Sequence, residues 1–103
     1  MDPRYGGHYR GGWSERDRAY HQGTVWGWLL GSYALAHARV HGRPLAARRI
    51  LEPTAHHLRT AGLGSVSEIF DGAPPHHPGG CIAQAWSVGE VLRAWVELTL
   101  AAD

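Results

Sequence analysis

Two carboxylates lie close together in the sequence SEIFDG, which contains Glu68 and Asp71. A loop glutamate near a wall of aromatic side chains can act as a general base, because its carboxylate stays ionised at working pH. Loop glutamates are more often solvated carboxylates, so this second interpretation of Glu68 stays open here. Asp71 is the alternative catalytic carboxylate, but it precedes Gly72 in DGAPP, a pattern that favours a turn in which the aspartate bonds its own backbone.

Histidine pairs and a single cysteine are the other residues able to do chemistry. His56 and His57 are adjacent, so on a helix they point to different faces and make a poor pair of metal ligands. No spacing of these residues with His76 and His77 matches a zinc site, and we expect no metal. The one cysteine, Cys81, excludes an internal disulfide, and we expect it to be a small buried residue.

Three helices are predicted as the elements that position these side chains. Residues 25–41 leave almost no polar face, which predicts a helix buried on both sides, with Thr24 as its N-cap. Residues 44–61 carry a narrower apolar stripe and predict a surface helix that Pro53 kinks or splits. Residues 83–101 predict a third helix with one broad apolar face.

The remaining residues, 1–24 and 62–82, are rich in glycine and predict loops. The second loop is long and contains Val66, Ile69 and Phe70, which give it side chains to bury and favour a functional loop. A buried helix, a surface helix and another buried helix expose more apolar surface than they can cover for one another. The pattern therefore predicts a part of something larger or an obligate oligomer.

Composition excludes several classes of protein. The 103 residues allow one domain, and ten basic against nine acidic residues give a net charge of +1, which excludes a basic nucleic-acid or membrane-binding patch. The first residues have no apolar core, so we expect no signal peptide, and no apolar run is long enough to span a membrane. We therefore expect a cytoplasmic protein. Five tryptophans are many for this length and are favoured where flat apolar ligands bind.

Two segments resemble a known family. They are RDRAYHQGTVWGWLLGSY, residues 16–33, and GSVSEIFDGAPPHHPGGCIAQAWSVGEVLRAW, residues 64–95. Both resemble the C-terminal amylo-α-1,6-glucosidase domain of glycogen debranching enzymes, with the glucoamylase-like six-hairpin glycosidases as more distant relatives. The resemblance implies an all-α fold, in which residues 1–103 form the C-terminal fragment of an α/α six-fold barrel. It also implies inverting hydrolysis of α-1,6 branch stubs in glycogen, without a cofactor.

The resemblance also implies roles for particular residues. Glu68 matches the position of the general base of the family. Asp17, His21, Gln22 and Trp26 fall in the segment that lines the sugar subsite. For Asp17 an exposed loop ion pair with its neighbour Arg16 stays an equal alternative, and for Trp26 the alternative is core packing. On a helix Trp26 and Trp28 point away from each other, so at most one of them contacts the ligand, and we favour Trp26.

The chain departs from the family pattern at several points. The general acid of the family belongs to an upstream motif resembling Thr-Trp-Met-Asp, and nothing of that type is present here. Gly27 and Ser32 stand where relatives usually have proline, and Ala73 replaces an acidic residue. His77 and Gly79 replace arginines, which weakens the expected contacts to sugar or loop.

Three functions are compatible with these observations. The first is a glycoside hydrolase fragment that acts on an α-glucan, with its general acid supplied from elsewhere. The second is a non-catalytic module that binds glycan or complements the missing upstream half of the barrel. The third is a helical interaction protein that forms a homo-oligomer through its broad apolar faces.

Overall fold

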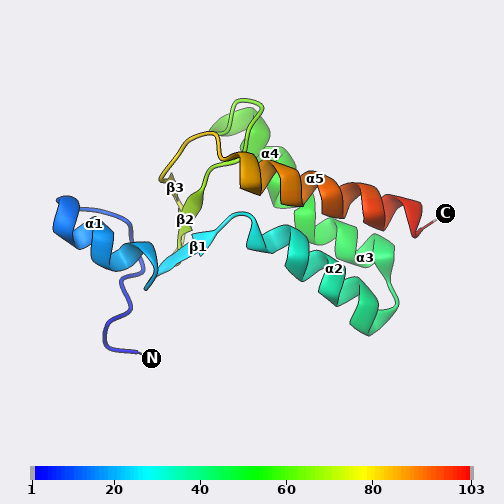
Figure 1. The fold of residues 1–103 in the computed structure, drawn as a ribbon, viewed down its shortest axis with the longest axis horizontal. Coiled ribbons are helices and arrows are strands. Elements are labelled where there is room, and N and C mark those ends of the chain that lie inside the picture. Colours follow the sequence, from blue (N-terminus) through cyan, green and yellow to red (C-terminus); the bar gives the residue numbers. More distant parts are fainter. Residues whose placement is uncertain (1, 103) are drawn as a thin grey trace.

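The computed structural model describes residues 2–102 as an elongated molecule of 48 × 32 × 20 Å. A body of packed helices occupies one end, the N-terminal segment with α1 occupies the other, and a small sheet lies between them (Figure 1). The elements in chain order are α1 (Trp13–Tyr20), β1 (Thr24–Trp26), α2 (Leu29–His41), α3 (Pro44–Arg48), η1 (Arg49–Leu51), α4 (Glu52–Thr60), β2 (Ile69–Asp71), β3 (Pro78–Gly79) and α5 (Ala85–Leu100). The fold is mostly helical, as predicted, with the small sheet as an addition.

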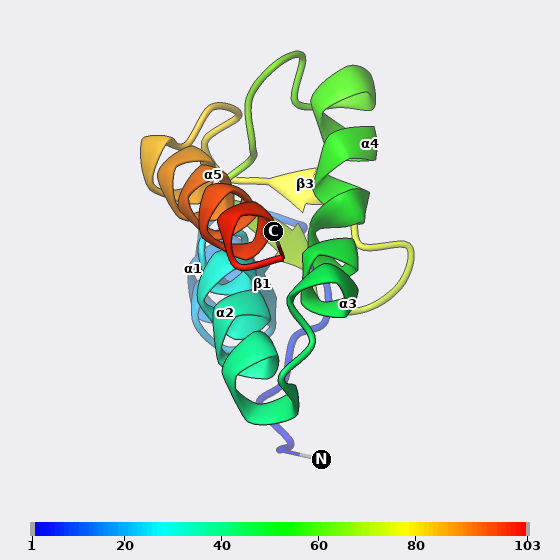
Figure 2. The ribbon, with the colours of Figure 1, turned by 90° about the vertical axis from the view of Figure 1, so that its right-hand side faces the viewer.

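The hydrophobic core lies where α2, α3 and α5 pack against one another (Figure 2). It is built from small and branched side chains at helical spacing, which are Ala34, Leu35, Ala47, Leu51, Ala94 and Leu98. Gly31 lies on the face of α2 that meets α5, and a Cβ there would collide with the backbone oxygen of Glu90. The absence of a side chain at Gly31 therefore permits the close approach of these two helices.

The predicted surface helix over 44–61 exists and is divided, as its internal proline indicated. A short 3-10 turn, Arg49–Leu51, separates α3 from α4, and Pro53 lies in the first turn of α4. Proline is tolerated there because the first amides of a helix have no partner inside the helix.

The helix predicted over residues 25–41 starts later in the structure than the sequence indicates. Its first residues form β1 instead, Thr24 is a strand residue rather than an N-cap, and α2 starts only at Leu29. The end of α2 is as expected, because Gly42 adopts the left-handed conformation with φ 62°. The amide of Gly27 donates to the backbone oxygen of Glu68 at 3.0 Å, and this long-range bond keeps the segment extended.

The two predicted loops are only partly irregular. Residues 13–20 form α1, which buries only Ala19 and therefore shows no apolar stripe in the sequence. Residues 62–82 contain β2 and β3, which join β1 in an antiparallel sheet of order β1-β2-β3. Val25 lies opposite Phe70 and Trp26 opposite Ile69, so alternate residues face opposite sides of the sheet.

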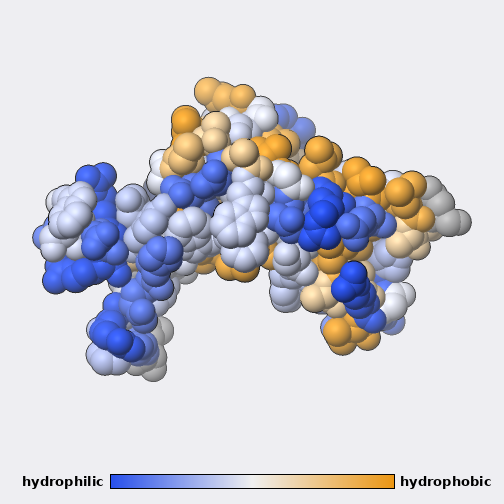
Figure 3. All heavy atoms as spheres, in the orientation of Figure 1, coloured by the Kyte–Doolittle hydropathy of each residue, from blue (hydrophilic) through white to orange (hydrophobic). Residues whose placement is uncertain are grey.

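Large apolar side chains remain exposed on the helices, as the surplus of apolar helix surface predicted. Tyr33 is 59% and Val40 76% exposed on α2, and Trp86, Leu92 and Leu100 are 53–70% exposed on α5. Figure 3 shows hydrophobic residues gathered along the edge where α5 runs. The two helices are thus covered on one side only. Within residues 2–102, no helix combines the length and the apolar character needed to cross a bilayer.

We expect Leu51→Ala to lower the free energy of unfolding by about 2–5 kcal/mol, because Leu51 is 1% exposed and its truncation leaves a cavity. Leu100→Ala, at a side chain that is 70% exposed, is the matched control and should stay within about 0.5 kcal/mol of the parent. Urea denaturation followed by circular dichroism measures both. Equal losses in the two variants would contradict the position of the core.

Candidate active site

Glu68 lies immediately before β2 and is held through its backbone on both sides. Its amide donates to the backbone oxygen of Cys81 at 2.9 Å, and its carbonyl accepts from the amide of Gly27 at 3.0 Å. Gly80 has φ 67°, and a Cβ there would collide with the carboxylate of Glu68. The close approach of the 79–81 backbone thus depends on glycine at this position.

The carboxylate of Glu68 accepts hydrogen bonds from three donors. Oε1 accepts from the hydroxyl of Tyr20 at 2.6 Å and from Nε2 of Gln84 at 3.2 Å, and Oε2 accepts from the amide of Cys81 at 2.9 Å. The Tyr20 bond, then the Cys81 amide, lower the pKa of Glu68 against the opposing effect of burial. The same bond to Glu68 raises the pKa of Tyr20 to about 12. Glu68 is therefore an oriented, half-buried carboxylate that is ionised at neutral pH, and not a freely solvated one.

Aromatic rings gather around Tyr20, whose hydroxyl binds this carboxylate. The ring of Tyr20 lies 5.8 Å from that of Tyr9 and 4.9 Å from that of Trp26, centroid to centroid. His21 stacks on Trp26 at 5.2 Å with 7° between the ring planes. Of the predicted sugar-binding residues, His21 and Trp26 are therefore brought together beside Tyr20, the residue whose hydroxyl binds Glu68.

Trp26 and Trp28 are separated, although not for the predicted reason. Trp26 is a strand residue and donates through Nε1 to the backbone oxygen of Tyr20 at 3.2 Å. Trp28 instead stacks on Trp86 at 4.2 Å, at the start of the helical body. The helical geometry assumed from sequence does not apply to this pair.

The other two predicted sugar-binding residues lie elsewhere. Asp17 is exposed on α1, and within residues 2–102 its carboxylate makes neither a side-chain hydrogen bond nor an ion pair, including with Arg16. The guanidinium of Arg16 instead lies 5.9 Å from the ring centroid of Tyr9. The side chain of Gln22 faces Asp2 at 3.5 Å and lines a separate cavity with arginines of the N-terminal segment and α1. The structure does not bring Asp17 or Gln22 into contact with Glu68.

Asp71 holds the N-terminal segment in place. It is 3% exposed, and its carboxylate accepts from the amide of Tyr9 at 2.8 Å and contacts Nδ1 of His8 at 3.0 Å, with Arg10 at 3.8 Å. Burial raises the pKa of Asp71, but the Tyr9 amide, His8 and Arg10 together outweigh it and lower the pKa. The predicted bond to its own turn is wrong, because the partners lie at the other end of the chain.

Sequence reasoning missed the direct partners of Glu68. Nothing in the sequence spacing of Tyr20 and Gln84 from Glu68 indicates their contacts. Cys81 is exposed, not buried as expected, and its Sγ contacts the backbone oxygen of Ala83 at 3.4 Å. In the part of the chain that the structure describes, no group of three or more potential metal ligands is gathered.

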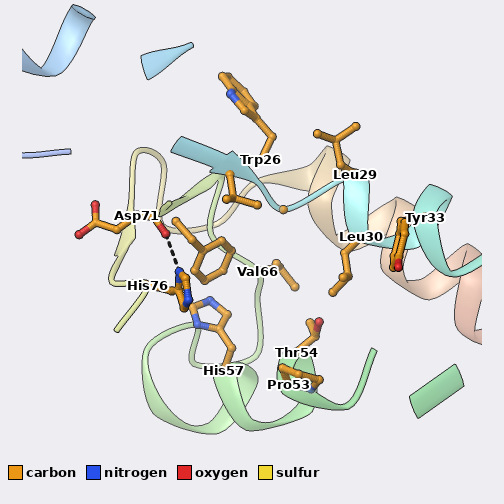
Figure 4. Close-up of a pocket in the computed structure, with 13 residues that line it drawn as sticks. Trp26, Leu29, Leu30, Tyr33, Pro53, Thr54, His57, Val66, Asp71 and His76 are labelled. Carbon is orange, nitrogen blue, oxygen red and sulfur yellow. Dashed lines mark hydrogen bonds between the residues drawn. The ribbon is translucent and has the colours of Figure 1, made fainter. Parts of the chain in front are cut away.

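An apolar cavity lies on the other face of the sheet. Its volume is about 480 Å³ and it opens to solvent, and Figure 4 shows Val66, His57 and Leu30 around it while Trp26 points away. Phe70, the strand neighbour of Val25, faces this cavity from β2. The sheet thus separates the charged surroundings of Glu68 from an apolar compartment between β2, α2 and α4.

Comparison with known proteins gives one match. The model of the family described as amylo-alpha-1,6-glucosidase matches residues 1–93. No curated protein and no solved structure matches the chain.

We expect Tyr20→Phe to raise the pKa of Glu68 toward its ordinary value of 4.5, because the phenol is the strongest of the donors that lower it. A lowered pKa means that ionised Glu68 stabilises the fold above the pKa of the unfolded chain. This contribution is lost as the pH falls through the folded pKa, and Tyr20→Phe makes it smaller. Titration of the Glu68 carboxyl carbon by NMR measures the shift. Tyr33→Phe, at a tyrosine of α2 that is 59% exposed, is the control, and a Glu68 pKa that is the same in both variants would refute the assignment.

Asp71→Ala should release the N-terminal segment, because it removes the acceptor of the Tyr9 amide and the anion beside His8 and Arg10. We expect tryptic cleavage at Arg10 to accelerate about tenfold or more, the equivalent of one lost buried hydrogen bond. Asp17→Ala, at an exposed carboxylate, should leave the cleavage rate unchanged. Equal rates for all three proteins would show that Asp71 does not hold the segment.

Proposed function

Because the chain belongs to the amylo-alpha-1,6-glucosidase family, the C-terminal domain of glycogen debranching enzymes, we propose that it takes part in hydrolysing α-1,6 branch stubs of glycogen. In this proposal Glu68 is the general base of an inverting reaction. The observation that carries it is the arrangement of Tyr20, Gln84 and the Cys81 amide, which keeps the Glu68 carboxylate ionised and oriented beside aromatic rings.

Inversion needs a carboxylate and a carboxylic acid on opposite sides of the sugar, about 6.5–9.5 Å apart, so that a water molecule fits between the base and the anomeric carbon. Glu68 would accept a proton from this water molecule while the oxygen of the water bonds to the anomeric carbon. At the same time the acid would protonate the departing O6 of the branch-bearing glucose. The lowered pKa of Glu68 suits the base and not the acid, which must be protonated when the substrate binds.

We infer that the general acid comes from outside residues 1–103, either from the same polypeptide or from another. Asp71 has a lowered pKa and is occupied by His8 and the Tyr9 amide, which makes it unsuitable as a proton donor. The chain then forms the C-terminal part of an α/α barrel. The apolar faces of α2 and α5 are exposed, which supports the inference that part of the domain lies outside residues 1–103. In the barrel these faces would pack against the preceding helices.

For the sugar subsite we propose Trp26 and His21. Trp26 offers an aromatic face close to Tyr20, and His21 supplies hydrogen-bonding nitrogens beside it. Sugars bind where an aromatic ring covers the C–H face and polar groups contact the hydroxyls. Asp17 and Gln22 stay predictions for contacts farther from the reacting bond.

The binding part of this proposal is testable on the chain itself. Titration with isomaltose, an α-1,6-linked disaccharide, should change the tryptophan fluorescence in a saturable way. Trp26→Phe should remove the change. Trp95→Phe, on α5 beside Arg48, is the matched control and should retain it. The absence of a saturable change at high millimolar isomaltose would contradict the sugar subsite.

The catalytic part is testable after residues 1–103 replace the corresponding segment of an active family member. We expect Glu68→Gln to lower kcat on a branched limit dextrin by about 10²–10⁴-fold, the usual contribution of a general base. Glu97→Gln, at a glutamate paired with Arg93 on α5, should leave kcat unchanged. Binding of isomaltose together with full activity of Glu68→Gln would favour a non-catalytic glycan-binding module.

A further inference from the structure

His57 is a buried histidine of α4 that the proposed reaction does not use. Its side chain accepts, through Nε2, a hydrogen bond from the backbone amide of Ser67 at 3.2 Å, and the residue is 8% exposed. Figure 4 shows its ring at the edge of the apolar cavity, below the sheet. Ser67 is the residue immediately before Glu68, so this imidazole holds the peptide that leads into the proposed general base.

The surroundings of His57 fix the ring in place. The ring of Phe70 meets it edge to face, with centroids 5.1 Å apart. Gly62 packs on the imidazole so closely that a Cβ there would lie 3.0 Å from both Cδ2 and Nε2. The backbone oxygen of His57 accepts from the amides of Ala61 and Gly62 at 3.2 and 2.8 Å. One residue therefore anchors both the start of the 61–68 loop and, through Ser67, its end.

We propose that His57 is a positioning residue for Glu68, and that protonation of its imidazole releases the Ser67–Glu68 segment from α4. The consequence for hydrolysis rests on the proposed role of Glu68, whereas the link between His57 and the loop does not. The orientation of the Glu68 carboxylate would then depend on pH through His57, which does not contact the sugar.

The chemistry of the bond requires the neutral ring. An imidazole nitrogen accepts an N–H only through its lone pair, so Nε2 is unprotonated while it binds the Ser67 amide, and the proton resides on Nδ1. A proton added to Nε2 would place two N–H groups head to head, and one of them must move. Burial, with a smaller effect of His56, lowers the pKa of His57 and keeps the ring neutral at neutral pH.

The other titratable groups around the ring offer no compensation for a positive charge. His56 neighbours it on α4, and the cavity is shared with Tyr33 of α2, Asp71 of β2 and His76 of the following loop. The carboxylate of Asp71 points toward His8 and Tyr9, and only its backbone oxygen faces His76, at 2.9 Å (Figure 4). Within residues 2–102, no hydrogen bond or ion pair joins His57 to a carboxylate.

The direction of the pH effect follows from these contacts. A folded-state pKa below that of the unfolded chain means that neutral His57 stabilises the fold above the unfolded value of 6.5. This contribution is lost as the pH falls below 6.5 and through the lowered pKa of folded His57. The loop before Glu68 should therefore loosen under acid conditions in which the helical core is still intact.

The test is amide hydrogen exchange of the full chain by NMR, corrected for intrinsic exchange, together with titration of the Glu68 carboxyl carbon. In the parent, protection of the Ser67 amide should fall about tenfold between roughly pH 7.5 and pH 5, while that of the Ala94 amide in the core is retained. His57→Gln keeps an acceptor near the position of Nε2 and does not titrate. Its Ser67 protection should be independent of pH, and its Glu68 pKa should equal that of the parent.

Two further variants complete the design. His57→Phe keeps a ring without an acceptor, and should lose Ser67 protection at every pH and shift the Glu68 pKa. His56→Gln, at the exposed neighbour on the same helix, is the matched control and should follow the parent. If His57→Phe does not fold, the comparison of the parent with His57→Gln still shows whether Ser67 protection depends on protonation of His57.

The proposal is overturned when Ser67 protection in the parent does not change with pH, or when it falls equally in His57→Gln. This readout is independent of sugar. A chain whose Ser67 exchange follows His57 but which does not bind isomaltose would support the positioning role and contradict the proposed function. A chain that binds isomaltose but whose Ser67 exchange does not depend on pH would support the proposed function and contradict the positioning role of His57.

Discussion

The half-buried carboxylate of Glu68 is the constraint on which the site depends. A carboxylate removed from water keeps its charge only when donors replace the lost hydration, and here the donors are Tyr20, Gln84 and the Cys81 amide. They come from the end of α1, the start of α5 and the segment after β3. The backbone of Glu68 is also bonded to Gly27 and Cys81, so the same residue joins the charged site to the short sheet.

The sheet gives the two sides of the molecule different chemistry. Alternation along β1 and β2 places Trp26 and Asp71 on the side of the N-terminal segment, and Val25 and Phe70 toward the apolar cavity. The polar side holds ionised carboxylates, while the other side keeps His57 neutral against the loop. A few strand residues thus connect the helical body to the proposed site. On the polar side Tyr20 binds the Glu68 carboxylate directly, whereas on the apolar side His57 binds the preceding Ser67 amide.

The helical body leaves apolar faces of α2 and α5 exposed to solvent. Leu92 and Tyr33 are more than half exposed on helices whose opposite faces form the core. A large exposed apolar surface is typical of an interface. The proposed remainder of the barrel would cover these faces and supply the second carboxyl group that inversion requires, so one partner would meet both needs.

The sequence by itself determined what depends on near neighbours. The end of α2 at Gly42 and the division of 44–61 before Pro53 follow from local backbone preferences. The helix predicted over 83–101 follows from apolar periodicity, and the structure has it as α5 over 85–100. The family was also readable, because its motifs are contiguous, and the match over residues 1–93 confirms it. Only the tertiary structure decided that residues 24–26 form a strand, that Tyr20 binds Glu68 and that Asp71 binds Tyr9. The physical reason is that these contacts join residues far apart in sequence, and short-range periodicity carries no information about such pairs.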